Sequence, residues 1–293
     1  MTAKIILRRI LARSFPKPFR KFVPGFVFQH IHFKGQFPVY WRKKRIGFLL
    51  SHNSLIENKI FWRGITKSDE GKSLEIFLNF VEIMKPKLIL DIGANTGVYG
   101  VLAKLISKES EVHFFDPIVG CLDAIQSNLN LNKMSGIINH VALSNYDGSG
   151  QIYMDKNKSM TYTVTLNVNR EPKNEQFVKA VTPVLTYVSY AKQKAIGIPD
   201  LVKIDVETHE NEVLQGFGSL LSPQTSFLIE ILSEEAARNL EKLLPNWNYD
   251  YWNIDDQKRV VKKQNHLTSS LYYNFFVCSP EVSNKLGLSR IIH

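Results

Sequence analysis

Two glycines and an acid stand close together after a short apolar segment. The segment 87–92 includes Asp91, and Gly93 and Gly97 follow within the run Gly93-Ala94-Asn95-Thr96-Gly97. Glycines let the backbone turn sharply and approach a ligand closely, and the free N–H groups at the start of a following helix can bind polar groups of that ligand. The pattern predicts a loop that binds a nucleotide-like cofactor. A glycine turn without a ligand is the alternative.

The spacing of these residues distinguishes between two classes of cofactor. Dinucleotide-binding loops read Gly-x-Gly-x-x-Gly, and this run lacks that spacing. The carboxylate of Asp91 would repel a pyrophosphate, whereas it would attract the α-amino group of a methionine moiety. The residues therefore favour S-adenosylmethionine (SAM) over a nicotinamide dinucleotide, with Asp91 as the expected partner of the amino group.

A second acid follows the next apolar segment. Asp116 and Pro117 come directly after the segment 111–115, and Asp116 stands 25 positions after Asp91. A carboxylate at the end of the second strand of such a fold can accept hydrogen bonds from both hydroxyls of an adenosine ribose. Asp-Pro after a strand is by itself typical of a turn. Its position relative to Asp91 and the glycine loop favours the ribose role.

Several ionisable residues stand where a later apolar segment, 199–206, meets the next expected helix. Lys203, Asp205, Glu207 and His209 are the candidate catalytic residues, since this end of a strand lies beside the cofactor crevice of an open α/β sheet. An alcohol nucleophile benefits from a base. His209 is the first candidate because it titrates near neutral pH, and Asp205 or Glu207 would serve if burial raises its pKa. A divalent metal held by Asp205, Glu207, His209 and Glu230 is less favoured, because their spacing does not demand one.

Other polar residues near this segment have a structural interpretation. Thr208 is expected to cap the next helix, where Glu210 and Glu212 in the first turn suit the helix dipole. Glu230 lies inside the apolar segment 226–231, where a charge is costly unless it is paired. A buried ion pair between Glu230 and Lys203 is the structural alternative to a role in the site.

The elements that would position these residues alternate between short strands and helices. Strands are expected at 87–92, 111–115, 137–143, 199–206, 226–231, 249–254 and 272–278, and helices at 74–84, 98–106, 118–129, 184–195, 209–221 and 234–244. Residues 144–180 are polar and suggest a loop or hairpin insertion, and strand-like runs also occur at 48–50 and 59–62. The alternation predicts a doubly wound, mostly parallel α/β sheet covered on both faces.

The positive charge of the chain is concentrated at its N-terminus. Residues 1–70 contain fifteen Lys or Arg and three Asp or Glu, a net charge of +12 in a chain whose total is +10. Residues 1–13 predict a short basic amphipathic helix that could lie on an anionic bilayer; a helix packed on its own domain is the alternative. No run of about 18 apolar residues is present. The two cysteines, Cys121 and Cys278, form no disulfide framework, so a cytoplasmic location, peripheral at a membrane surface, is expected.

Several short motifs resemble the FkbM-type methyltransferase family. The resemblance is carried by Leu90–Tyr99, Phe115-Asp116-Pro117, Asn128–Asn132, Val141-Ala142-Leu143-Ser144 and Asp200–Glu207, and it covers about residues 73–280. It implies a class I, Rossmann-like methyltransferase domain whose seven-stranded sheet has one antiparallel strand, and O-methylation of sugar or polyketide hydroxyls. We therefore expect a basic extension at 1–72, a methyltransferase domain at 73–282 and a tail at 283–293.

The same resemblance implies a set of cofactor contacts. They are Asp91, Gly93, Ala94, Asn95, Gly97, Tyr99, Asp116, Pro117, Ala142, Leu143 and Asp205. Two positions depart from the family pattern: Asp116 stands where Glu is usual, and Thr208 and His209 follow Glu207 where Gly is usual. The second departure affects the acceptor side of the site.

Other functions stay open from the residues alone. The acceptor is expected to be a small molecule, a glycan or a glycolipid, and an RNA methyltransferase that grips phosphates with the basic segment is the alternative. Base N-methylation in this fold commonly uses an Asn/Asp-Pro-Pro-aromatic run after the fourth strand, where this chain reads Asp205-Val206-Glu207-Thr208. Nucleic acid is therefore disfavoured. A binding module without activity and a nicotinamide dehydrogenase are weaker alternatives.

Overall fold

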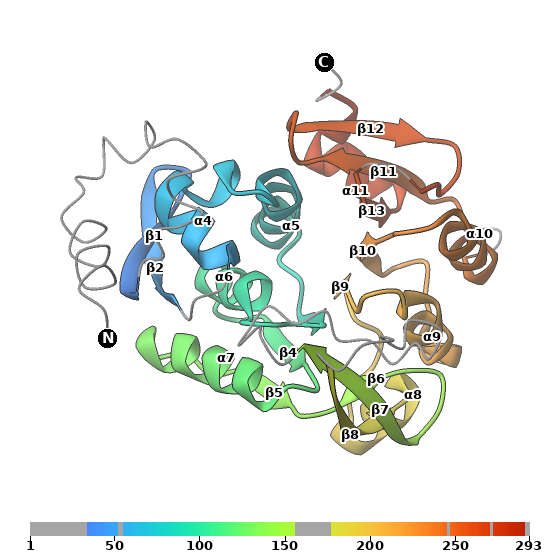
Figure 1. Ribbon diagram of the computed structural model, residues 1–293. Coiled ribbons are helices and arrows are strands. Elements are labelled where there is room, and N and C mark those ends of the chain that lie inside the picture. Colours follow the sequence, from blue (N-terminus) through green and yellow to red (C-terminus); the bar gives the residue numbers. More distant parts are fainter. Residues whose placement is uncertain (1–33, 52–54, 156–176, 245–246, 270–271, 291–293) are drawn as a thin grey trace.

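A central eight-stranded sheet organises the fold (Figure 1). The computed structural model describes residues 34–51, 55–155, 177–244, 247–269 and 272–290. The expected N-terminal helix at 1–13 lies outside these residues, as do residues 156–176 of the expected insertion. The strand order is β12-β11-β13-β10-β9-β3-β4-β5.

Five neighbouring strands of this sheet are parallel. They are β5 (Ile137–Asn139), β4 (Glu111–Phe115), β3 (Leu88–Ile92), β9 (Leu201–Ile204) and β10 (Ser226–Glu230). The chain builds outward from β3 through β4 to β5, then crosses back and builds the other way from β9 to β10. The carboxyl ends of β3 and β9 therefore meet at the switch point, where open α/β sheets bind their ligands.

The remaining strands extend the sheet beyond β10. β13 (Asn274–Cys278) runs antiparallel to both β10 and β11 (Asp250–Asp255), and β12 (Val260–Gln264) forms an antiparallel hairpin with β11. The seven strands that we expected are present, and β12 is an eighth at the edge. The class I methyltransferase fold predicted from the sequence is confirmed.

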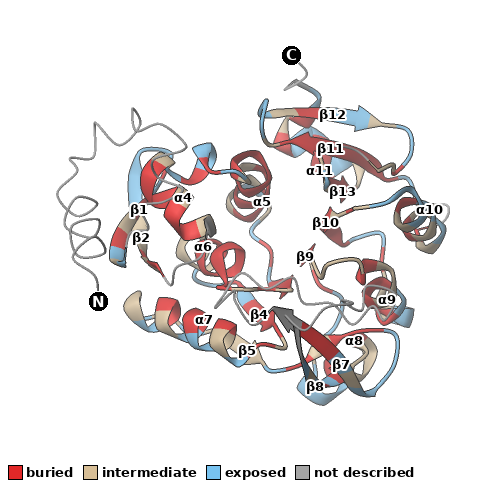
Figure 2. Cartoon of the chain, in the orientation of Figure 1, coloured by how far each residue is buried: buried red, intermediate tan, exposed pale blue. Residues whose placement is uncertain are grey.

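Helices cover both faces of the sheet (Figure 1). One core contains side chains of α5 (Gly71–Met84), α6 (Val98–Ile106), α7 (Val119–Leu131) and α11 (Pro280–Leu286); the other contains those of α8 (Tyr187–Lys194), α9 (Glu210–Gln215) and α10 (Glu234–Leu243). Short 3-10 turns lie at η1 (Ile65–Lys67), η3 (Gly218–Leu220) and η4 (Leu288–Arg290). Buried residues fill the central strands, α5 and α6 (Figure 2).

The segment before α5 packs against the first core. β1 (Gly35–Trp41) and β2 (Lys44–Ser51) form a hairpin, and α4 (Leu55–Arg63) follows. Phe37, Leu49 and Phe61 belong to the same core as α5 and α6. The run 59–62, expected as a strand, lies within α4, since its buried aromatic residues pack as one face of a helix rather than as a sheet strand.

A second, three-stranded sheet projects from the central one. Its order is β6 (Ala142–Leu143), β8 (Phe177–Leu185), β7 (Gly148–Asp155), with β7 and β8 antiparallel, so the expected hairpin insertion is present. Two boundaries differ from expectation. The run 137–143 divides between β5 and β6 in different sheets, and the run 184–195 begins as the end of β8 before α8 starts beyond the N-cap Thr186.

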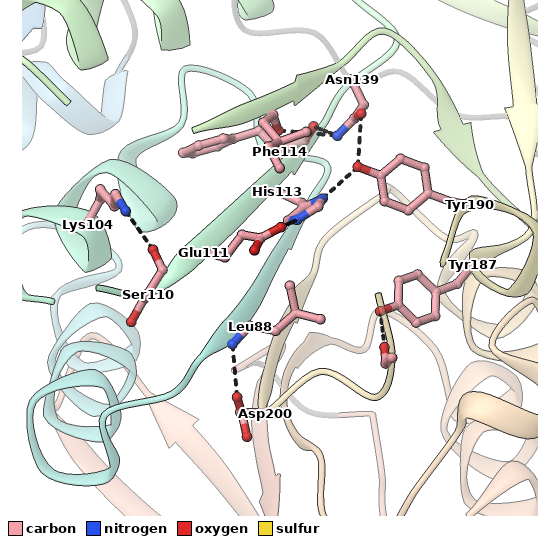
Figure 3. A network of polar contacts seen from close by, with 12 residues as sticks. Leu88, Lys104, Ser110, Glu111, His113, Phe114, Asn139, Tyr187, Tyr190 and Asp200 are labelled. Atoms are coloured by element: carbon pink, nitrogen blue, oxygen red, sulfur yellow. Dashed lines mark hydrogen bonds and ion pairs between the residues drawn. The ribbon is translucent and has the colours of Figure 1, made fainter. Parts of the chain in front are cut away.

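A polar network fixes α8 against β4. Figure 3 shows His113 within hydrogen-bond distance of Glu111 (2.6 Å) and of the Tyr190 hydroxyl (2.6 Å), which also donates to Asn139 (3.0 Å). The ring of Tyr190 packs edge-on against Phe115, with centroids 4.7 Å apart. This network holds the end of β4, which forms one wall of the site.

Candidate active site

A cavity of about 450 Å³ opens at the carboxyl ends of β3, β4, β9 and β10. Its volume is within the range of about 300–1,000 Å³ that small-molecule sites occupy. Every site residue expected from the sequence lines it except Asp91 and Gly97. The cavity therefore brings the glycine loop, the β4 end and the β9 end to one place.

The glycine loop is held by backbone hydrogen bonds to the next strand. The N–H groups of Gly93 and Ala94 both donate to the carbonyl of Phe115 at 3.0 Å. Gly93 has φ +69°, and a Cβ at this position would lie 1.9 Å from the carbonyl oxygen of Asp205. Gly97 also has positive φ (+75°), and a Cβ at this position would meet the side chain of Ile125; neither residue lines the cavity. Gly97 thus shapes the loop, and Gly93 lets β3 and β9 approach each other.

Asp91 lies behind the cavity wall, which corrects the expectation that it meets the amino group of the cofactor directly. Its side chain is fully buried, and Oδ2 accepts a hydrogen bond from the N–H of Gly100 at 2.9 Å. Oδ1 lies 3.9 Å from the ammonium of Lys203 and has no hydrogen-bond partner in the described residues. Burial raises the pKa of Asp91 to about 6, although Lys203 opposes the shift. Asp91 therefore supports the start of α6 and the position of Lys203.

Asp116 lies on the wall, with both carboxylate oxygens already bonded to the backbone. Oδ2 accepts from the N–H of Asn95 (2.8 Å) and Oδ1 from the N–H of Ile118 (2.9 Å). Burial raises its pKa to about 6. Each carboxylate oxygen has a second lone pair, so the predicted bonds to ribose would use those that the backbone leaves. Asp116 also joins the glycine loop to the start of α7.

Lys203 is a buried cation at the base of the site. Its ammonium donates to the carbonyl of Gly93 (2.8 Å) and forms ion pairs with Asp205 (3.2 Å) and Asp91 (3.9 Å). Burial opposes its charge, but the carboxylates of Asp205 and Asp91 outweigh burial and raise its pKa. Lys203 therefore keeps its proton, which excludes it as a general base and makes it a fixed counter-charge.

The turn after β9 contains two residues in the left-handed backbone region. Glu207 has φ +55° and Thr208 has φ +77°, which is unusual for residues with a Cβ and most of all for a β-branched one. The buried carboxylate of Glu210 accepts from the N–H groups of Val206 (3.2 Å) and Thr208 (3.1 Å). Thr208 is not the helix cap that we expected; His209 occupies the N-cap of α9. Glu210 fastens the turn instead, and Glu207 lines the cavity.

His209 lines the cavity but is held by two neighbours. Its Nε2 lies 2.9 Å from the hydroxyl of Ser144, and its Nδ1 lies 3.6 Å from the carboxylate of Glu212. Burial lowers its pKa. The ring is therefore neutral at physiological pH, and both nitrogens face protein groups.

Glu230 ends β10 on the same wall. The ion pair with Lys203, which was the structural alternative for Glu230, is not formed within the described residues, where Lys203 pairs with Asp205 and Asp91. Burial, followed by the negative charges of Asp205 and Glu207, raises the pKa of Glu230 to about 9. Glu230 is therefore protonated near neutral pH and can donate a hydrogen bond.

Two wall residues come from the segment that sequence composition assigned to the extension. Ile56 of α4 and Glu70, directly before α5, both line the cavity. The carboxylate of Glu70 accepts a hydrogen bond from the hydroxyl of Tyr99 at 2.8 Å. No local pattern in the sequence marks these residues, because only the packing of α4 and α5 against α6 brings them to the site.

The family comparison agrees with this geometry. A sequence model described as the methyltransferase FkbM domain matches residues 91–251, which include the glycine loop, Asp116 and the whole turn after β9. The chain belongs to the FkbM methyltransferase family. It is a SAM-dependent methyltransferase. No curated protein matches the sequence.

Several solved methyltransferases resemble the FkbM chain in structure at low sequence identity. A SAM-dependent methyltransferase from Agrobacterium tumefaciens has a TM-score of 0.46 at 10% identity, covering 87% of this chain and 79% of that one. An O-methyltransferase from Bacillus cereus, solved with S-adenosylhomocysteine (SAH), has 0.40 at 12%, covering 70% and 79%. A ribosomal protein L11 methylase from Lactobacillus delbrueckii subsp. bulgaricus has 0.37 at 12%, covering 68% and 75%.

The cavity of this FkbM domain fits SAM in its chemistry. Phe115, Ile118 and Leu143 provide an apolar wall suited to an adenine ring. Near the glycine loop, the buried oxygens Oγ1 of Thr96 and Oδ1 of Asn95 have no hydrogen-bond partner within the described part of the chain. Buried polar atoms are normally satisfied, and a ligand with polar groups would satisfy these two.

Three further observations concern metal ligands, cysteines and membrane-spanning helices. Within the described residues, no group of three or more His, Cys, Asp or Glu side chains is arranged to hold a metal ion. Cys121 and Cys278 are free and buried, and Cys121 lines the cavity. Among the helices of the described segments, none is long and apolar enough to cross a membrane.

Proposed function

We propose that this protein transfers a methyl group to a hydroxyl of a sugar, glycan, glycolipid or similar small natural product. The observation that carries the proposal is the group of carboxyls at the ends of β9 and β10, where Asp205, Glu207 and Glu230 line one wall beside the glycine loop. Carboxylates accept hydrogen bonds from hydroxyls, and a protonated carboxyl can also donate one. A polyhydroxyl acceptor suits such a wall.

When bound, SAM supplies an electrophilic methyl group on a sulfonium. The chain must then orient an acceptor hydroxyl in line with that methyl, exclude water and accept the hydroxyl proton. The oxygen–methyl bond forms as the sulfur–methyl bond breaks, and the proton moves from the acceptor oxygen to a side chain of the protein.

Glu207 is the side chain that we assign to this proton. Lys203 is already protonated, and Glu230 holds its own proton near neutral pH. His209 faces Ser144 with Nε2, and its pKa is lowered. The proposal thus prefers Glu207 to His209, our first candidate, because the turn fastened by Glu210 holds Glu207 at the cavity.

Glu230 has a complementary role in this proposal. A carboxyl that keeps its proton can donate a hydrogen bond to an acceptor oxygen while Glu207 accepts the departing proton. Asp205 is held by Lys203 at 3.2 Å, and its ion pair keeps it at the edge between the cofactor and the acceptor. Glu230 would thus donate the hydrogen bond, and Glu207 would accept the proton.

The proposal includes a peripheral contact between the basic N-terminal segment and an anionic membrane, in the cytoplasm. It rests on the charge of residues 1–70 and on the chemistry of a glycolipid acceptor. RNA is the less favoured acceptor, because the carboxylates of the cavity wall would repel a phosphate backbone.

Incubation with methyl-labelled SAM and fractionated extract of the source cells tests the acceptor class. We expect label in a carbohydrate or glycolipid fraction, and we expect Glu207→Gln to reduce it by at least ~100-fold, as for loss of a general base. Glu235→Gln, an exposed change in α10, is the matched control and should leave labelling unchanged. Label in RNA, or full activity of Glu207→Gln, would contradict the proposal.

A further inference from the structure

Glu70 occupies a position on the cavity wall that no motif predicts. It precedes α5, and its side chain meets the first turn of α6, where the hydroxyl of Tyr99 donates to Oε2 at 2.8 Å. No described residue donates to Oε1. One oxygen of the carboxylate is thus fixed by the protein, and the other is left for a ligand.

The groups around Glu70 define a small region at one end of the cavity. Lys203 lies 5.7 Å from the centre of the Tyr99 ring, and its charge is already balanced by Asp205 and Asp91. Glu70 is in ion-pair distance of no cation in the described residues. Glu70 is therefore a half-buried carboxylate that is influenced by the charge of Lys203 but forms no ion pair with it, so a cation that enters the cavity can pair with it.

A second polar group without a partner in the described residues belongs to the same cavity wall. Thr96, which begins the approach to α6, is 1% exposed and lines the cavity, and its hydroxyl has no partner in the described residues. The expected partner of the cofactor amino group, Asp91, is behind the wall. The amino group of the cofactor therefore needs a protein carboxylate other than Asp91, the partner predicted from the sequence.

We propose that Glu70, oriented by Tyr99, binds the α-ammonium group of the amino-acid end of SAM. The inference rests on SAM as the ligand of this cavity. The ammonium would form the ion pair that Glu70 lacks in the described residues, and the Thr96 hydroxyl would bind another polar group of the ligand. Asp91 would act indirectly, through Lys203 and the backbone of α6. The segment before α5 is then part of the cofactor site.

Calorimetry with two adenosine ligands tests this assignment. SAH carries the ammonium, whereas 5′-methylthioadenosine has the nucleoside and the sulfur but no amino acid. At pH 8 we expect Glu70→Gln to weaken SAH binding about 10- to 100-fold, as for loss of a charged hydrogen bond. It should leave methylthioadenosine binding unchanged. The pH is chosen because burial and the charge of Asp205 raise the pKa of Glu70 to about 7.

A control variant and a ligand change keep the test independent of folding. The variant Glu75→Gln changes a residue of α5, the helix that follows Glu70, and this residue does not line the cavity. It should bind SAH as the unaltered protein does. In the unaltered protein, SAH without its α-amino group should bind about 10- to 100-fold more weakly than SAH, a comparison that needs no variant.

The outcomes separate the two proposals. Unchanged SAH affinity in Glu70→Gln overturns the assignment of Glu70, as does an equal loss for SAH and methylthioadenosine, which would indicate a structural role. In either case the cofactor itself stays bound in the unaltered protein. If the unaltered protein binds neither ligand, the assignments of SAM and of Glu70 fail together.

Discussion

Replacing Thr208 by glycine should stabilise this protein or leave its stability unchanged, although glycine normally weakens a folded chain. Thr208 has φ +77°, and a residue with a Cβ loses about 1–2 kcal/mol in the left-handed region. Glycine removes that strain but costs about 0.5–1 kcal/mol of backbone entropy. The difference predicts a change in the free energy of unfolding between zero and about +1.5 kcal/mol.

The partner of this strained turn is Glu210. Its buried carboxylate accepts two backbone N–H groups, from Val206 and Thr208. A net of about 0.5–1.5 kcal/mol per hydrogen bond gives a loss of about 1–3 kcal/mol for Glu210→Ala. Glu210→Gln retains an acceptor oxygen and should lose less than half of that.

Urea denaturation followed by circular dichroism measures these changes. Thr66→Gly is the control, because Thr66 is exposed and its φ is not positive, so glycine there should cost about 0.5–1 kcal/mol. If Thr208→Gly costs as much as Thr66→Gly, the turn is not strained. If Glu210→Gln lowers the free energy of unfolding as much as Glu210→Ala does, the two hydrogen bonds do not hold the turn.

Three further predictions concern the loop, the helix before it and the charge of the site. Gly93→Ala should abolish SAH binding measured by calorimetry, because its Cβ would meet a backbone oxygen at 1.9 Å; Gly287→Ala, with positive φ but nothing within 4 Å, should cost only about 1–2 kcal/mol of stability and leave binding intact. Asp256 accepts two backbone N–H groups at the start of α5, so Asp256→Ala should lower the free energy of unfolding by about 1–2 kcal/mol in urea; no loss would refute the cap. Burial raises the pKa of Glu70 to about 7 and that of Glu230 to about 9, from an ordinary value of 4.5, so the folded protein holds extra protons between pH 4.5 and those values. The ligand-free protein should therefore lose thermal stability as pH rises from 6.5 to 9, and a rising unfolding midpoint would contradict these shifts.

Local patterns were enough to predict the central architecture. Short runs of apolar residues such as 88–92 and 201–204 are buried on both sides, which makes them recognisable as parallel strands. The glycine loop was also predictable, because positive φ and close backbone approach at Gly93 restrict that position to glycine. In both cases the residue types themselves record the constraint: an apolar run marks a strand buried on both faces, and glycine marks a position with no room for a Cβ.

Features that depend on contacts between distant segments could not be predicted in the same way. The run 137–143 is apolar throughout, yet β5 pairs with β4 while β6 pairs with β8, and only the partner strands reveal the division. Whether the side chain of Asp91 reaches the cavity depends on the direction in which it points from β3, and the sequence alone is compatible with either direction. The same holds for the ion pair between Glu230 and Lys203 that was the structural alternative: in the structure Lys203 pairs with Asp205 and Asp91 instead.

The segment that precedes the family match carries two different properties, and they need not serve the same purpose. Its net positive charge is a property of composition and suits an anionic surface, whereas Ile56 and Glu70 act through position, since each lines the cavity. Glu70 is one of only three acids among the first 70 residues, and it is the one that faces the site. If Glu70 binds the cofactor as we propose, the basic segment couples the region around α4 and α5 to cofactor binding, whatever surface the rest of the segment contacts.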